Sequence, residues 1–158
     1  MKKTNAARIL DRLKIPYEIR TYDVDETDLS AEAAAIKLGL PPEQVFKTLV
    51  AKTDRKEVVL ACIPGSAELD LKALGAATGA KRSNLVPVKD VQALTGYIRG
   101  GVSPLGTRKP YSLFLDRTAE TWETISVSAG LRGIQLLIAP QDLIRATNAT
   151  PGDFTKPV

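Results

Sequence analysis

The chain has 158 residues, of which 44% are hydrophobic and 25% are charged, and its formal net charge is +4 at pH 7. These values are ordinary for a globular protein, and because we find no linker or repeat we expect a single domain over residues 1–158. The longest apolar runs are too short to cross a bilayer and the N-terminus lacks the apolar core of a signal peptide, so we expect a cytoplasmic protein without membrane contact.

Helices and strands are interleaved in the first half of the chain. Thr4, Ser30 and Asp70 each precede a helix-forming run and are good N-caps, since their side-chain oxygens can accept hydrogen bonds from the first helical turn. The predicted elements are, in chain order, a helix between Thr4 and Pro16, a strand over 17–22, a helix over 31–38 that ends at Gly39, strands over 45–50 and 57–63 that form a hairpin, and a helix over 71–78.

The second half contains most of the remaining strands. Its predicted elements are a short helix over 89–94, a glycine-rich segment over 96–106, strands over 111–116, 124–128 and 134–139, a helix that starts at Pro140, and a frayed tail over 151–158. Several strands are joined by short turns. We therefore predict an α/β protein of the α+β type, with a curled, mixed, mainly antiparallel sheet flanked by helices.

The absence of histidine restricts the chemistry that the chain can perform. The sequence has no histidine and a single cysteine, Cys62. Ser-His-Asp and Cys-His catalysis and histidine-ligated zinc are therefore excluded, as is an internal disulfide. Cys62 lies in an apolar strand pattern and is expected to be a core residue. An enzyme of this composition must activate its reaction by other means, and we expect neither a metal nor a cofactor.

A lysine stands in the middle of the apolar strand pattern V-F-K-T-L-V, residues 45–50. Its charge is costly to remove from water without a partner. Lys47 therefore either reaches solvent from the edge of a sheet or points into a cavity that receives an anionic group.

Glycine is concentrated in the segment T-G-Y-I-R-G-G-V-S-P-L-G, residues 95–106. Backbone N–H groups of such a loop can hold an anion or an oxyanion, but glycine also shapes loops with no such role. The segment is neither a P-loop nor a dinucleotide fingerprint. A second loop, S-V-S-A-G-L-R-G over 126–133, could form another pocket wall or be a plain hairpin connection.

The remaining candidates are weaker. Ser103 and Ser128 are conceivable nucleophiles, although only a lysine could activate them. The acidic segment over 23–28 lacks the glycine turn and the ordered spacing of a calcium loop, so we expect it to be solvated. Trp122 and Tyr111 are expected to pack rather than to stack on bases. All of the net positive charge lies beyond residue 80, and a basic surplus over 81–110 could attract a phosphate backbone or be an ordinary surface.

Five motifs in register resemble the YbaK/EbsC family of trans-editing aminoacyl-tRNA deacylases, and most of all its Cys-tRNA(Pro) deacylases. They are I-P-Y-E-I-R-T-Y-D, V-F-K-T-L-V, T-G-Y-I-R-G-G-V-S-P-L-G, E-T-I-S-V-S-A-G-L-R-G and I-A-P-Q-D-L, and they span about residues 6–147. The resemblance implies a YbaK-like fold and hydrolysis of mischarged Cys-tRNA(Pro). Such editing is needed because one binding site separates near-isosteric amino acids poorly.

The resemblance also implies a set of site residues. The motif lysine falls on Lys47, and the paired glycines fall on Gly100 and Gly101; we assign these three residues to catalysis. The residues expected to bind substrate are Tyr22, Thr48, Ser103, Pro104 and Ser128. In cysteine-specific members of the family the substrate thiol attacks its own carbonyl, which suits a chain without histidine, because a well-oriented intramolecular attack can supply about 7–11 kcal/mol.

Alternative functions stay open from the sequence. One is editing of another small amino acid, such as alanine on tRNA(Pro), which would require attack by water. Another is a tRNA-binding module without catalysis. Since so small a protein has little surface with which to select a tRNA, we expect prolyl-tRNA synthetase as a partner. The sequence does not fix the oligomeric state.

Overall fold

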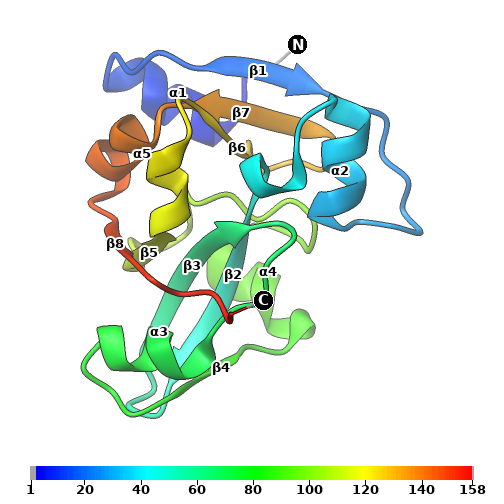
Figure 1. Ribbon diagram of the computed structural model, residues 1–158. Coiled ribbons are helices and arrows are strands. Elements are labelled where there is room, and N and C mark those ends of the chain that lie inside the picture. The colour runs from blue at the N-terminus through cyan, green and yellow to red at the C-terminus, as the bar shows by residue number, and fades with distance from the viewer. Residues whose placement is uncertain (1–2, 158) are drawn as a thin grey trace.

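The computed structural model describes residues 3–157, which form two β-sheets and five α-helices. A three-stranded sheet has the order β1-β7-β6 and is antiparallel throughout. In Figure 1 it lies above the second sheet, next to α1 and α5. Its strands are β1 (Glu18–Thr21), β6 (Ile125–Ser128) and β7 (Ile134–Ile138).

The second sheet has five strands in the order β4-β2-β3-β5-β8. The pairs on either side of β2 are antiparallel, whereas β3-β5 and β5-β8 are parallel. Its strands are β2 (Phe46–Thr53), β3 (Val58–Pro64), β4 (Ser83–Leu85), β5 (Leu113–Asp116) and β8 (Thr150–Gly152). An isolated parallel bridge between Val45 and Ser126 joins the two sheets.

The predicted fold class is confirmed, with one difference. The strands are mixed and mainly antiparallel, as expected, but they form two sheets that meet at the Val45–Ser126 bridge instead of one continuous curled sheet. The hairpin of β2 and β3 is also confirmed, with Lys47 paired to Ile63 and Thr48 to Cys62. Cys62 is fully buried, in agreement with the predicted core position.

Three of the helices begin directly after the N-cap residues that we predicted from the sequence. The side-chain oxygens of Thr4, Ser30 and Asp70 accept hydrogen bonds from the backbone N–H groups of Ala7, Ala33 and Ala73. None of the helices described between residues 3 and 157 is long and apolar enough to cross a membrane. The helices are α1 (Asn5–Arg12), α2 (Ala31–Leu38), α3 (Leu71–Ala77), α4 (Val88–Thr95) and α5 (Pro140–Thr147).

The C-terminal segment is ordered, so the prediction of a frayed tail over 151–158 is wrong for the residues that the structure describes. Strand β8 pairs with β5, and Phe154 is only 3% exposed, with its ring packed edge-on against Phe114. The buried Asp116 carboxylate accepts the Phe154 N–H at 2.9 Å. A buried aromatic ring and a sheet edge hold this segment, whose proline and glycine suggested a loop. The final residue, Val158, lies outside the described part.

Candidate active site

Strand β2 has a free edge in its first half. It pairs with β3 over residues 46–52, but with β4 only over residues 51–53. The Val50 carbonyl points away from β3, since it accepts the Val86 N–H. Backbone groups alternate in direction along a strand, so the N–H and C=O of Thr48 also point to the open side. This unpaired stretch of strand forms the floor of a pocket.

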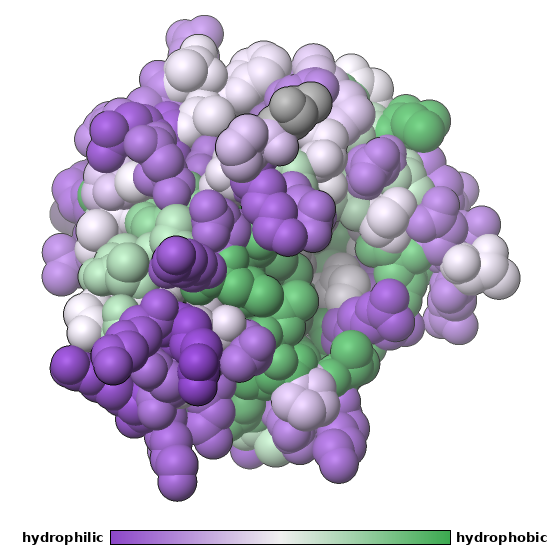
Figure 2. All heavy atoms as spheres, turned by 60° about the horizontal axis from the view of Figure 1, so that its bottom comes forward, coloured by the Kyte–Doolittle hydropathy of each residue, from purple (hydrophilic) through white to green (hydrophobic). Residues whose placement is uncertain are grey.

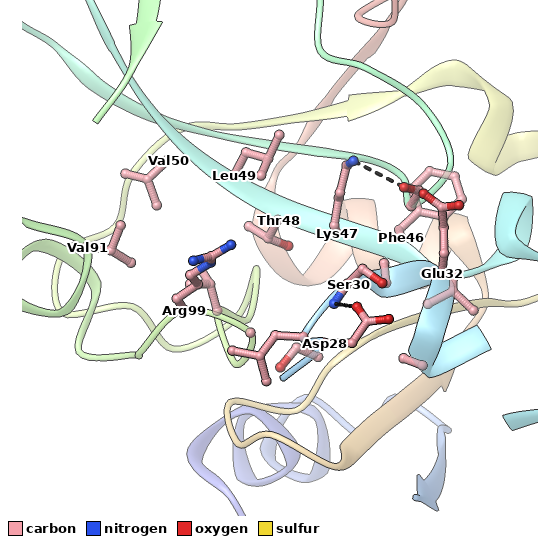
Figure 3. Close-up of a pocket in the computed structure, with 18 of the residues that line it drawn as sticks. Asp28, Ser30, Glu32, Phe46, Lys47, Thr48, Leu49, Val50, Val91 and Arg99 are labelled. Atoms are coloured by element: carbon pink, nitrogen blue, oxygen red, sulfur yellow. Dashed lines mark hydrogen bonds between the residues drawn. The ribbon is translucent and has the colours of Figure 1, made fainter. Parts of the chain in front are cut away.

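The pocket has a volume of about 480 Å³. Figure 3 shows Ser30 and Glu32 toward one end, Val50, Val91 and Arg99 toward the other, and Thr48 between them. The lining residues come from both sheets, from the start of α2, from the connection between β4 and α4, and from the glycine-rich loop: Tyr22, 27–32, Ala34, 45–50, Gly65, Leu85, Val86, Val88, Val91, Arg99, Gly100, Val102, Ser128 and Gln135.

Lys47 lies at the polar end of the pocket. Its Nζ donates to the Gly65 carbonyl oxygen at 3.1 Å, and its side chain is half-buried (Figure 3). Burial lowers the pKa of the Lys47 ammonium, while the nearby carboxylates of Glu32 and Glu68 act in the opposite direction. The ammonium lies beyond salt-bridge distance of these carboxylates. It therefore keeps donor capacity for an acceptor in the pocket.

Thr48 carries an unpaired hydroxyl. The residue is 9% exposed, and its Oγ1 is the one buried side-chain polar atom between residues 3 and 157 that lacks a hydrogen-bond partner. A buried hydroxyl without a partner costs about 1–3 kcal/mol. Thr48 lies opposite Cys62 in the β2–β3 hairpin, and its hydroxyl lies close enough to the buried thiol to lower the thiol pKa, against the larger effect of burial. Since Thr48 also lines the pocket, a ligand group could supply the oxygen or nitrogen partner that the hydroxyl lacks.

The glycine-rich loop turns sharply beside the pocket. The Gly101 N–H donates to the Ile98 carbonyl at 2.9 Å, and Gly100 has a φ of 84°. This sign of φ is the one that a type II turn requires at its third residue. The Gly101 N–H is therefore committed to the turn. Within the described chain the Gly100 N–H has no intramolecular acceptor, and Gly100 lines the pocket whereas Gly101 does not.

Tyr22 and Ser128 also lie at the pocket, on the side of the three-stranded sheet. The Tyr22 N–H donates to the Gly133 carbonyl at 2.9 Å, which fixes the residue at the end of β1. The Ser128 hydroxyl accepts the Gly130 N–H at 3.1 Å and keeps its own proton available to a ligand.

Three of the predicted residues, Gly101, Ser103 and Pro104, lie outside the lining. Ser103 and Pro104 are buried under the loop, and the Ser103 hydroxyl accepts the Leu105 N–H at 3.2 Å. These two residues and Gly101 are buried on the side of the loop that faces away from the pocket, where they fix its shape. The structure thus brings Tyr22, Lys47, Thr48, Gly100 and Ser128 to one pocket and leaves Gly101, Ser103 and Pro104 behind its wall.

A family model described as the aminoacyl-tRNA editing domain matches residues 26–146 of the chain. This match includes nearly all of the pocket lining. The chain belongs to the aminoacyl-tRNA editing domain family. The recognition made from the sequence motifs is confirmed.

Relatives of this editing domain include both free-standing proteins and parts of synthetases. The chain is 42% identical over 154 residues to EbsC of Enterococcus faecalis, named as a candidate Cys-tRNA(Pro)/Cys-tRNA(Cys) deacylase; the match covers 98% of this chain and 94% of EbsC. It is 40% identical over 77 residues to a proline–tRNA ligase of Desulforamulus reducens, which covers 49% of this chain and 13% of the ligase.

The fold of the editing domain is also found in a crystal structure described as a candidate trans-editing enzyme for prolyl-tRNA synthetase. The two chains superimpose with a TM-score of 0.83 at 21% identity, over 99% of this chain and 100% of the other. At this identity the likeness concerns the fold.

The lining residues of the editing domain that sequence reasoning did not assign to the site include Asp28, Ser30, Glu32 and Arg99. Asp28, Ser30 and Glu32 flank the start of α2, and Arg99 precedes the paired glycines. Asp28 belongs to the acidic segment that we expected to be solvated, and it is exposed, but it also borders the pocket. The position of Arg99 beside Gly100 in the sequence was the available signal for that residue.

Gly65 is a further residue that the sequence did not single out. A Cβ atom at this position would lie 2.5 Å from the Ala31 Cβ and 2.9 Å from the Val45 carbonyl oxygen. Only glycine therefore lets the start of α2 approach the end of β3. The Gly65 carbonyl is also the acceptor for Lys47, so one glycine sets both a wall of the pocket and the position of its ammonium.

Proposed function

We propose that this editing domain removes cysteine from mischarged Cys-tRNA(Pro). The proposal rests on one arrangement, in which the Lys47 ammonium, the unpaired Thr48 hydroxyl and the free Gly100 N–H border a single pocket without a histidine base. Such a pocket can bind and polarise an ester but is poorly equipped to attack it. The similarity to EbsC over nearly the full chain supports cysteine as the substrate amino acid.

The reaction requires a nucleophile, and the substrate itself contains one. The sulfur of the cysteinyl group attacks its own ester carbonyl, so that a C–S bond forms while the C–O bond to the terminal ribose breaks. The ribose oxygen leaves with the thiol proton, and water then opens the released thiolactone to cysteine. Orienting the thiol against the carbonyl supplies most of the acceleration.

Each pocket group has a role in this scheme. The Gly100 N–H and the Thr48 hydroxyl donate to the developing oxyanion, which preorganised donors stabilise better than water does. Lys47 binds an oxygen of the terminal nucleotide, either phosphate or ribose. Tyr22 and Ser128 position the ribose or the amino group, while Gly101, Ser103 and Pro104 keep the loop in place.

We further propose that the protein works in the cytoplasm with prolyl-tRNA synthetase. The segment shared with a proline–tRNA ligase supports this partner, because it shows a related sequence inside such an enzyme. A ternary complex with the synthetase and the tRNA would supply the tRNA selection that a 158-residue chain has little surface to provide.

A deacylation panel tests the proposal. The purified protein is incubated with Cys-tRNA(Pro), Ala-tRNA(Pro), Cys-tRNA(Cys), Pro-tRNA(Pro) and S-methylcysteinyl-tRNA(Pro), with and without prolyl-tRNA synthetase. We expect rapid loss of cysteine from tRNA(Pro), little loss of alanine or proline, and no accelerated loss of S-methylcysteine, because its sulfur cannot form the thiolactone. Equal hydrolysis of the cysteinyl and S-methylcysteinyl esters would refute thiol attack, and retention of tRNA without ester loss would indicate a binding module.

A further inference from the structure

The pocket is larger than a small aminoacyl group requires, and it has a polar end and an apolar end. Its volume of about 480 Å³ lies within the range of about 300–1,000 Å³ typical of sites for whole small ligands. Of the groups that we assign to the substrate, Lys47 lies at the polar end and Thr48 lies between the two ends (Figure 3). The other end is lined by Leu49, Val50 and the connection between β4 and α4, and the proposed chemistry makes no use of it.

This other end is an apolar shelf, formed by Leu85, Val88 and Val91. Leu85 is 51% exposed and Val88 is 59% exposed, although both are large apolar residues, and all three line the pocket. Figure 2, which brings the β4 and α4 end of the molecule forward, shows apolar side chains gathered in a hollow between hydrophilic ones. Exposed apolar surface that continues a binding pocket indicates contact with an apolar part of a ligand.

A guanidinium lies beside the shelf. Arg99 lines the same pocket, and Figure 3 shows its side chain toward the end occupied by Val91 and Val50. Its backbone carbonyl accepts the Arg132 Nε–H at 2.9 Å, which anchors the residue to the neighbouring loop. None of the salt bridges between residues 3 and 157 involves the Arg99 side chain. The planar group is therefore free to face a ligand.

We infer that the shelf and Arg99 form a subsite for the adenine base of the tRNA's terminal nucleotide. The inference rests on the proposed function, because the ester to be cleaved hangs on the ribose of that nucleotide and the base lies one sugar away from the reacting carbonyl. An adenine has two flat apolar faces. One face packs on Leu85, Val88 and Val91, and the Arg99 guanidinium stacks on the other, a mode by which proteins hold unstacked bases.

The alternative role for Arg99 is to pair with a backbone phosphate. Two features favour the base. The shelf presents apolar side chains. These cannot donate hydrogen bonds to a phosphate, whereas they can pack against the flat apolar face of an adenine. Lys47, at the other end of the pocket, already provides a point charge for an oxygen of the terminal nucleotide. With the base held at one end and the ester at the other, the terminal nucleoside spans the pocket.

A double-mutant cycle, with one change in the protein and one in the tRNA, tests this subsite. Deacylation is measured for the wild-type protein and for Arg99→Ala, each with Cys-tRNA(Pro) ending in adenosine and with Cys-tRNA(Pro) whose terminal residue is abasic. We expect each single change to slow the reaction by about 10-fold or more, the loss typical of one stacked base. The two changes together should cost little more than either one alone, since both remove the same contact.

Further variants separate stacking from charge. Arg99→Lys should lose nearly as much as Arg99→Ala, because lysine keeps the charge but lacks the planar group. Leu85→Ser should weaken activity on the adenosine substrate but not on the abasic one. Leu13→Ser is the matched control for this change, with a leucine that is 46% exposed and lies just after α1, outside the pocket. It should behave as wild type.

Binding provides a readout that does not depend on catalysis. The full protein is titrated with uncharged tRNA(Pro) that ends in adenosine and with uncharged tRNA(Pro) whose terminal residue is abasic. Loss of the base should weaken wild-type binding several-fold and weaken Arg99→Ala binding much less. If both proteins lose affinity by the same factor, or if Arg99→Ala slows the adenosine and the abasic substrate by the same factor relative to wild type, the subsite is refuted and Arg99 is a phosphate contact. Should wild type bind as expected without releasing cysteine, the proposed function fails while the adenine subsite stands.

Discussion

The Lys47 ammonium donates to the Gly65 carbonyl oxygen at 3.1 Å, while the Gly65 N–H donates to the Val45 carbonyl at 2.7 Å. Both backbone polar groups of Gly65 therefore form hydrogen bonds, one with the side chain of Lys47 in β2 and one with the carbonyl of Val45, which directly precedes β2. The side chain of Lys47 is held at the rim of the pocket instead of extending into bulk water. The position of the Lys47 ammonium therefore depends on the backbone of a glycine, Gly65.

Lys47→Ala should lower deacylation of Cys-tRNA(Pro) by about 10- to 150-fold, because a hydrogen bond to a charged group contributes about 1.5–3 kcal/mol. Folding stability should change little, since Lys47 is half-exposed and its removal would let water from the pocket reach the Gly65 carbonyl. The check is deacylation kinetics together with thermal unfolding. Lys72→Ala removes an exposed lysine on α3 and is the control. Equal rates for both variants would exclude Lys47 from the reaction.

Gly65→Ala should disturb the pocket and the fold together. The new methyl group would lie 2.5 Å from the Ala31 Cβ, and relief of such overpacking typically costs about 1–3 kcal/mol. We expect a lower midpoint of urea unfolding and reduced deacylation as α2 moves away. The double variant Gly65→Ala/Ala31→Gly should recover part of the stability, because it removes the nearest clashing atom. No recovery would show that the 2.9 Å approach to the Val45 carbonyl dominates.

Thr48→Val should separate stability from activity. The substitution keeps the shape of the side chain but removes a buried hydroxyl that has no partner, so unfolding should become more costly by about 1 kcal/mol. Deacylation should slow by about 10-fold, because the oxyanion donor that we propose is lost. Urea denaturation and single-turnover kinetics measure the two effects. A loss of stability would reveal that the hydroxyl has a partner in the folded protein.

Cys62 should make the protein less stable at alkaline pH. Burial raises the pKa of its thiol to about 12, whereas an unfolded cysteine has a pKa near 8.5. Between these values the unfolded chain releases a proton that the folded chain retains, so stability falls as pH rises. The slope has a limit of about 1.4 kcal/mol per pH unit.

The measurement is the free energy of unfolding at pH 8 to 10.5 for wild type and Cys62→Ala. Lysine and tyrosine titrations are common to both proteins and cancel in the difference. Wild type should lose stability relative to the variant above pH 8.5. Parallel curves for the two proteins would mean that the thiol ionises as readily in the folded state as in the unfolded one.

Phe154→Ala should destabilise the fold by about 3–5 kcal/mol, the usual cost of truncating a buried phenylalanine. The ring packs edge-on against Phe114, at a centroid distance of 5.6 Å. Thermal unfolding and proteolysis of the C-terminal segment measure the effect. Lys156→Ala, which removes an exposed ion pair with Glu68 in the same segment, should change stability by less than about 1 kcal/mol. Similar small losses for both variants would show that this segment adds little to the fold.

Local signals in the sequence predicted most of the elements. The three capping residues Thr4, Ser30 and Asp70 marked helix starts because their side chains bond the adjacent turn, an interaction within a few residues. Strands β5, β6 and β7 were visible as apolar runs. The missed strands, β4 and β8, have three residues each, and β8 contains Pro151 and Gly152. Their pairing is set by distant neighbours, which a single sequence does not display.

The site was predicted in part for the same reason. Lys47 attracted attention because a charge inside an apolar strand needs an explanation, and the motifs supplied Tyr22, Gly100 and Ser128. Tertiary contacts decide the rest. The turn at Ile98 uses the Gly101 N–H, and burial removes Ser103 from the pocket. Arg99 joins the lining because the loop folds back over the edge of β2, which residue spacing alone does not reveal.

The unpaired hydroxyl of Thr48 has an evolutionary consequence. On the role that we propose for Thr48, selection for turnover would retain threonine although valine is expected to make the fold more stable. A duplicated copy of the domain that had lost its tRNA substrate would be free to drift toward the more stable residue. The identity of residue 48 across related genomes would then distinguish working editors from retired copies without any assay.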